Sequence, residues 1–192
     1  MNQPQAGHDQ VHRDRWCPEG AVITGSATVH VDDPAAVRRR IPGVYADPVA
    51  WLMAEAVAAA LEDCGDAAPG RPEEVGVIGV SEHATRHTLR ALADAVPRGR
   101  LSPMRFAGAG PGSLVGVICS AFGFHGPVSM LPMPLGAAVT PVRALCGDWL
   151  LGDPPGAAHV LVVTHTTTDE GKHRAQSLVV SGPAPTRRPR RT

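Results

Sequence analysis

The sequence alternates between short apolar runs rich in β-branched residues and longer segments with helical signals. Gly, Pro or Asp residues bound the apolar runs, which favours strands. The expected strands cover 21–31, 75–80, 127–131, 158–166 and 175–180. The expected helices cover 47–65, 84–96, 110–124 and 136–152. Strands that alternate with helices predict an α/β fold, with three layers built on a largely parallel sheet.

Length and composition indicate a single domain. The chain has 192 residues, of which 43% are hydrophobic and 19% charged, which is typical of a globular protein with a real core. Residues 1–18 are polar and residues 183–192 are rich in Pro and Arg, so both ends are expected to be disordered. The expected domain therefore covers residues 19–182.

Charge and cysteine content exclude some classes of partner and indicate a compartment. The 18 basic and 18 acidic residues cancel, which argues against a dedicated nucleic-acid or membrane-surface protein. The basic tail is interpreted as a solvated end, with an acidic partner as the alternative; it holds Arg187, Arg188, Arg190 and Arg191. Scattered cysteines, no signal-peptide core and no membrane-spanning run predict a reduced, cytoplasmic protein. The cysteines, expected to be free thiols, are Cys17, Cys64, Cys119 and Cys146.

An ordered set of motifs over residues 20–181 resembles the N-terminal half of β-ketoacyl synthases, which have the thiolase fold. The Ser-Pro-x-x-Phe segment is matched by Ser102, Pro103 and Phe106, and the Gly-hydrophobic-x-Gly-Pro turn by residues 123–127. A strand, a sharp elbow, an Ala/Gly-rich helix and another strand follow in the family's order. The resemblance implies a five-stranded mixed sheet in which the last strand runs antiparallel and the strand "PVSML" lies at an edge.

The elbow is the point at which the chain departs from the family. It consists of Met133, Pro134, Leu135 and Gly136. The register of the Gly-Pro turn puts Leu135 where ketosynthases have their acyl-accepting cysteine, which the N-terminus of a helix activates. We expect Leu135 to be buried there, with no nucleophile or histidine within reach. The family's two catalytic histidines come from a C-terminal half, and no counterpart of that half is expected in this chain.

The resemblance therefore predicts a non-catalytic ketosynthase-like subunit of polyketide or fatty-acid biosynthesis, similar to the chain-length factors. Its partner would be a second copy, an active ketosynthase or an acyl carrier protein, and no cofactor is expected. One alternative is an enzyme of altered chemistry, such as acyl transfer or decarboxylation, that uses the backbone amides of Gly136 and Ala137 as an oxyanion site. Another alternative is the product of a decaying gene.

Pairing is expected at the family's usual seam. The predicted interface strand contains Val128, Ser129, Met130 and Leu131. It is short and apolar, and such a strand can extend a partner's sheet. Without a second half, the helices at 111–122 and 136–151 are also expected to leave apolar side chains uncovered. These side chains are Leu114, Val117, Ile118, Leu145 and Leu150.

Several other polar groups have both a functional and an ordinary interpretation. His83 and His87 have an i, i+4 spacing that suits zinc, but no third ligand stands out, so a solvated helix face is preferred. His165, Asp169 and His173 follow a strand end and are interpreted as part of a polar loop. The "GAGPG" segment at 108–112 lacks the Lys of a P-loop and is interpreted as a helix start rather than an anion cradle.

Overall fold

In the computed structural model the chain is described over residues 13–183, apart from 38–40, 42–43 and 101. The strands are β1 (Val22–Val31), β2 (Val75–Ser81), β3 (Val128–Leu131), β4 (His159–Thr167) and β5 (His173–Ser181). The helices are α2 (Pro48–Asp63), α3 (Arg86–Ala95), α4 (Pro103–Ala107), α5 (Ser113–Phe122) and α6 (Leu135–Leu151). Four short 3-10 turns lie between them: Pro34–Ala36, Gly65–Ala67, Pro72–Glu74 and Val96–Arg98.

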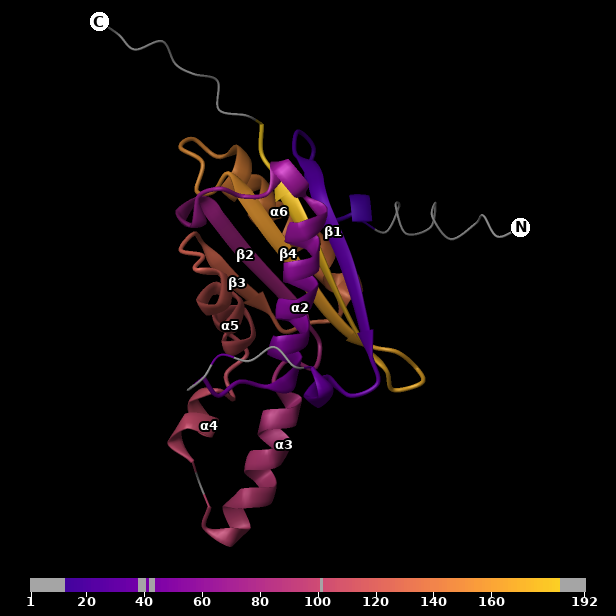
Figure 1. Ribbon diagram of the computed structural model, residues 1–192, viewed down its shortest axis with the longest axis vertical. Helices are drawn as coiled ribbons and strands as arrows, with labels where there is room; N and C mark the ends of the chain where they lie inside the picture. The colour runs from indigo at the N-terminus through magenta and orange to yellow at the C-terminus, as the bar shows by residue number, and fades with distance from the viewer. Residues whose placement is uncertain (1–12, 38–40, 42–43, 101, 184–192) are drawn as a thin grey trace, which may run out of the picture.

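The five strands form one mixed sheet in the order β1-β5-β4-β2-β3 (Figure 1). β4 pairs in parallel with β2, and β2 in parallel with β3, whereas β5 is antiparallel to both β1 and β4. Only β5 therefore runs against the other strands of this sheet. The α/β class, the mixed five-stranded sheet, the antiparallel last strand and the edge position of β3 confirm the predictions.

The sequence explains why the first long helix begins where it does. The Asp47 side chain accepts a hydrogen bond from the backbone N–H of Val49, and Pro48 occupies the first helical position. The other oxygen of Asp47 accepts from the backbone N–H of Thr88, at 2.8 Å. One buried carboxylate thus caps α2 and ties α3 to it.

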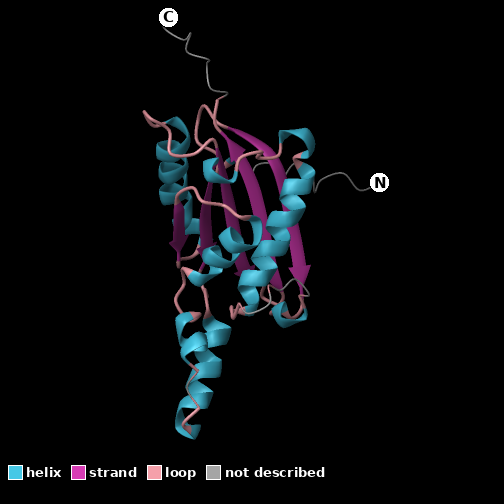
Figure 2. Cartoon of the chain, turned by 60° about the vertical axis from the view of Figure 1, so that its left-hand side comes forward, coloured by secondary structure: helices cyan, strands magenta, loops and turns pink. Residues whose placement is uncertain are grey.

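Helices cover both faces of the sheet, and each face has its own core (Figure 2). Alternate residues of a strand point to opposite faces, so Val77 packs with α2 and α5 while Ile78 packs with α6. All seven residues of β2 are buried, as expected for a central parallel strand. The predicted three-layer arrangement is therefore present within a single chain.

The two cores overturn the expectation of uncovered helix faces. Leu114 and Ile118 are fully buried, Val117 and Leu150 are 4% exposed, and Leu145 is half-buried. The expectation was wrong because these helices turn their apolar faces to their own sheet and to α2. The apolar faces of these helices therefore give no support for a partner.

The expected disorder of residues 1–18 is also wrong for the part that the structure describes. Trp16 is 1% exposed and packs in the α6 core, with the Arg15 guanidinium 4.8 Å from its ring centre. The Arg13 side chain donates a hydrogen bond to Ser26 on β1. An indole of this size stabilises the segment by its burial. The rest of that segment and the Arg-rich tail from 184 onward lie outside the described residues.

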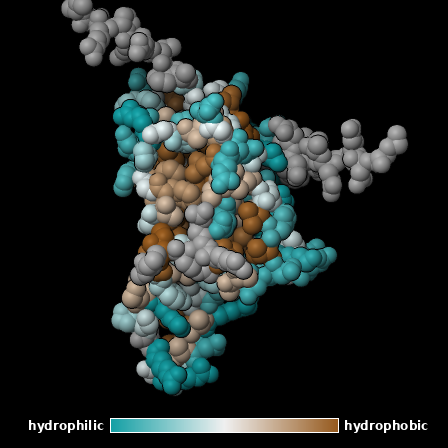
Figure 3. Space-filling model, viewed as in Figure 1, coloured by the Kyte–Doolittle hydropathy of each residue, from teal (hydrophilic) through white to brown (hydrophobic). Residues whose placement is uncertain are grey.

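The segment formed by α3, the turn Val96–Arg98 and α4 projects beyond the sheet as an arm (Figures 1 and 2). Four large apolar side chains on it are more than half exposed: Leu89, Val96, Met104 and Phe106. In the view of Figure 3, apolar surface gathers over the body of the molecule, and the far end of the arm is mostly hydrophilic. No helix within the described part of the chain is long and apolar enough to cross a membrane.

Candidate functional site

Polar side chains from three adjacent strands meet at the end of the sheet where the parallel strands finish. The β2–β4 register places Ser81 directly beside His165. In the β4–β5 hairpin Thr167 pairs with His173 and His165 pairs with Ala175. His165 and His173 are thus diagonal neighbours on one face of the sheet, close enough for their rings to touch. In open α/β sheets this end is where ligands bind.

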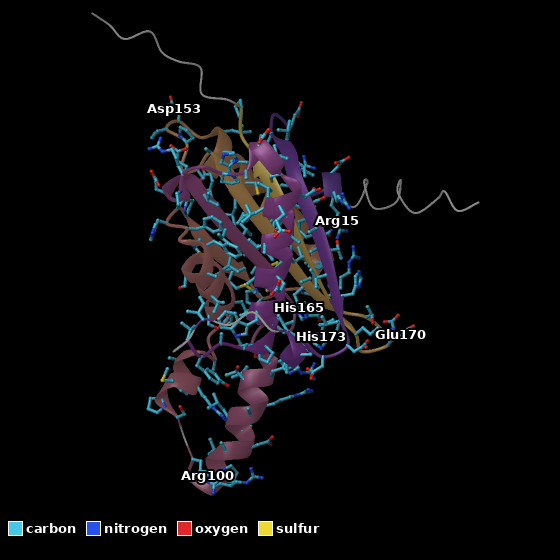
Figure 4. The ribbon with its side chains drawn as sticks, viewed as in Figure 1. Arg15, Arg100, Asp153, His165, Glu170 and His173 are labelled. Atoms are coloured by element: carbon cyan, nitrogen blue, oxygen red, sulfur yellow. The ribbon has the colours of Figure 1, made fainter. Side chains whose placement is uncertain are left out.

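Hydrogen bonds join these three side chains into a chain. Ser81 Oγ lies 2.9 Å from His165 Nδ1, and His165 Nε2 lies 3.0 Å from His173 Nδ1 (Figure 4). Ser81 Oγ also accepts from the backbone N–H of Ala84. Both nitrogens of the buried His165 ring are therefore partnered, which fixes its orientation.

Burial and neighbouring imidazoles keep this cluster uncharged. Desolvation, helped by the proximity of His173, His83 and His87, lowers the pKa of His165 to about 3. Desolvation and His87 also lower the pKa of His173, against an opposing effect of Asp33. The rings of His87 and His173 have centroids 5.5 Å apart. At neutral pH His165 is consequently a neutral donor and acceptor.

Two cavities border the cluster. The larger, which we call the histidine pocket, has a volume of about 230 Å³ and lies between α3 and the β4–β5 hairpin. Its lining residues include His83, Arg86, His87, Arg90, His165 and His173. The smaller cavity, of about 80 Å³, is bordered by Leu135, His83 and His165.

The elbow places Leu135 as the first residue of α6, directly after the edge strand β3. The expectation that it is buried is wrong: it is half-buried, because only one side of it packs on the α6 core. His83 and His165 border the same cavity as Leu135. Leu135 itself offers no nucleophilic atom.

The helix end is a poorer oxyanion site than the sequence indicated. The backbone N–H of Ala137 donates to the Pro134 carbonyl at 3.1 Å. Of the two amides considered, Gly136 and Ala137, the second is therefore already engaged. Pro134 is the N-cap and provides no side-chain hydrogen bond to the helix.

The cysteines offer no replacement for the nucleophile that is missing at the elbow. All four are free, with Cys64 and Cys146 buried and Cys17 and Cys119 half-buried. Burial raises the pKa of the Cys146 thiol to about 12 and also raises that of Cys119. Neither thiol is poised to form the thiolate that acyl transfer requires.

Sequence reasoning misjudged the histidines. His83 lies in the turn before α3 rather than on a helix face, and His165 and His173 are strand residues rather than loop residues. Within the described ranges, no three His, Cys, Asp or Glu side chains are placed to hold a metal ion. The sequence did contain a signal for their proximity. His165 lies near the end of one apolar run and His173 just before the next, and when two such runs form a hairpin these residues lie close together.

The predicted interface strand forms an edge of the sheet. Val128 is 48% exposed, whereas Ser129, Met130 and Leu131 are half-buried. β3 pairs with β2 on one side, and no described strand pairs with its other side. The backbone of β3 is thus open to a further strand.

No protein-family model and no curated protein matches the sequence. Solved structures do resemble it. The ishigamide ketosynthase/chain length factor has a TM-score of 0.58 and 15% identity, covering 88% of this chain and 64% of that chain. A type II PKS acyl-carrier protein in complex with its ketosynthase has a TM-score of 0.59 and 14% identity, covering 84% of this chain and 62% of that chain. A ketosynthase in complex with its chain length factor from Xenorhabdus doucetiae has a TM-score of 0.58 and 12% identity, covering 86% of this chain and 80% of that chain.

At these identities the likeness establishes the fold, which is thiolase-like over most of the chain. The chain spans less than two-thirds of the length of the first two of these structures. The sequence motifs and the three-dimensional comparison thus agree on the architecture of a ketosynthase half-domain.

Proposed function

We propose that this protein is a non-catalytic ketosynthase-like subunit of polyketide or fatty-acid biosynthesis, which pairs with an active ketosynthase or an acyl carrier protein. The single observation that carries the proposal is the residue at the start of α6. From the sequence resemblance we infer that Leu135, the first residue of α6, stands at the position of the acyl-accepting cysteine, and leucine has no atom that can attack a thioester. The raised pKa values of Cys119 and Cys146 give no substitute nucleophile.

Two surfaces support the pairing part of the proposal. β3 leaves a backbone edge open beside the elbow, with Val128 half exposed. The arm projects beyond the sheet (Figure 2) and carries exposed apolar side chains, such as Phe106 at 68% exposure. Two of the similar structures are complexes in which a ketosynthase is bound to a chain length factor or an acyl carrier protein. We transfer that mode of assembly to this chain as a hypothesis.

The pairing test is co-expression with the ketosynthase encoded nearest to it in its genome, followed by co-purification and sedimentation. A stable complex that Met130→Lys weakens is the expected result, because a buried charge at the β3 edge is costly to desolvate. Glu55→Lys is the control, since it places a lysine on another element, α2. Equal behaviour of the two variants, or a monomer under all conditions, would contradict the pairing role.

The catalytic part is tested by incubation with acyl thioesters and intact-protein mass spectrometry. The unmodified chain should gain no acyl group. Leu135→Cys is the positive control, because a thiol at a helix N-terminus has the thiolate favoured by the helix dipole. Acylation of the unmodified chain would overturn the non-catalytic assignment.

A second function, decarboxylation or acyl transfer of altered chemistry, is favoured by one observation. His83 and His165 border the same 80 Å³ cavity as Leu135, so imidazoles stand beside the helix end where an oxyanion would form. Release of CO₂ from a malonyl thioester, lost in His83→Gln, would support this function. No release above the buffer rate would leave the non-catalytic role as the better account.

A further inference from the structure

We propose that the histidine pocket binds a small oxyanion: a carboxylate group or the phosphate of a phosphate ester. The helical wall of this site belongs to the arm, but anion binding is a property that the proposed function does not include, so the inference goes beyond it. It rests on a cavity whose walls carry an unusual concentration of cationic and hydrogen-bond-donating side chains.

The two walls of the pocket come from different parts of the chain. From the α3 side, Arg86 and Arg90 stand four residues apart and therefore share one face of the helix. His87 lies on α3 and His83 lies in the turn before it, and both line the same pocket. From the sheet side come the strand residues His165 and His173. Guanidinium groups remain charged at any physiological pH and match the geometry of carboxylates and phosphates.

The acidic groups around the pocket are largely occupied elsewhere. Both oxygens of Asp47 accept backbone N–H groups, and one oxygen of Asp33 caps the turn Pro34–Ala36. On the hairpin, Glu170 forms an ion pair with Lys172 at 3.1 Å. The residues that line the pocket in the described structure include no carboxylate. An incoming anion therefore meets positive charge without a competing acid in the wall.

The buried hydrogen-bond chain orients a donor at this site. A neutral His165 that accepts from the Ser81 hydroxyl at Nδ1 donates from Nε2 to Nδ1 of His173. His173 then carries its own proton on Nε2, which makes that nitrogen a donor. Because His165 is held on both sides, it acts as a positioning residue for His173 rather than as a ligand.

The size of the pocket limits what can enter. Pockets for drug-sized ligands usually measure about 300–1,000 Å³. The histidine pocket, at about 230 Å³, suits a small ion or the anionic end of a longer molecule. A carboxylate and a phosphate ester share this chemistry, and the two are separated by experiment.

The test is titration of the full chain with inorganic phosphate and, separately, with acetate at pH 7 and constant ionic strength. Calorimetry gives the affinity, and the imidazole ¹⁵N signals of His165 and His173 report the location. We expect saturable binding of at least one anion, with shifts of these two imidazoles. Tighter binding of phosphate would identify a phosphate-ester ligand, and tighter binding of acetate a carboxylate ligand.

The double variant Arg86→Gln, Arg90→Gln should bind roughly tenfold more weakly, the order expected when charge-assisted hydrogen bonds are lost. The control Arg98→Gln, Arg100→Gln removes the same charge and should bind as the wild type does, because Arg98 lies in the turn Val96–Arg98 and Arg100 at the far end of the arm (Figure 4). Equal weakening by both double variants would reduce the effect to non-specific charge and overturn the proposal. So would the lack of saturable binding of either anion, or binding that leaves both imidazole signals unmoved.

Discussion

Replacing His165 by glutamine should remove a large part of the acid sensitivity of this protein. The pKa of His165 is about 3 in the folded protein, against 6.5 for an unperturbed histidine. Below pH 6.5 the unfolded chain therefore binds a proton at this histidine that the folded chain does not bind. The free energy of unfolding consequently falls as the pH falls toward 3. Between pH 8 and pH 5 this linkage lowers the free energy of unfolding by about 2 kcal/mol.

The measurement is urea denaturation of the wild type and of His165→Gln at both pH values. The wild type should lose at least the amount given by His165, because the lowered pKa values of His159 and His173 act in the same direction. The variant should lose about 2 kcal/mol less, since glutamine does not titrate.

Two results would refute this reasoning. One is a loss of stability that is equal in the wild type and in His165→Gln, which would mean that the buried imidazole titrates normally. The other is a wild type that becomes more stable between pH 8 and pH 5, which is opposite to the sign expected for a buried histidine with a lowered pKa.

Incubation with acyl-CoA should leave the mass of the wild type unchanged, whereas Leu135→Cys should gain an acyl group; an adduct on Cys146 would contradict the burial of that thiol. Met130→Lys should weaken any complex formed through β3, as sedimentation would show, and an unaffected complex would exclude this edge. Gly126→Ala should destabilise the fold by about 1–3 kcal/mol in thermal unfolding, because its Cβ would strike the Val75 carbonyl. Gly136→Ala has open space at the Cβ and should cause no loss; similar losses in both variants would contradict the contact.

Local sequence signals determined most of the elements of this fold. Apolar runs rich in β-branched residues indicated the strands, and Asp47 with Pro48 indicated the start of α2. These signals are local because capping and side-chain periodicity involve residues only a few positions apart. The short helix α4 was missed, since five residues leave too little periodicity to detect.

The antiparallel direction of the last strand and the edge position of β3 were predicted from the resemblance to a known family rather than from the strands themselves. Nothing in the residues of β5 fixes its antiparallel direction. The same resemblance located Leu135 at the start of α6, and the structure places it there. It misled on the helix faces, because a half-domain was assumed to need the cover of a second half, whereas these helices are covered by their own sheet and by α2.

The histidine pocket was decided by tertiary structure. His83, His165 and His173 are separated by up to ninety positions along the chain, and no local pattern relates them. Strand pairing sets Ser81 beside His165, and the hairpin register sets His173 diagonally next to them. Registers of this kind depend on hydrogen bonds between distant segments. The sequence by itself thus determined the elements and the residue at the elbow, and only the folded sheet assembled the site beside it.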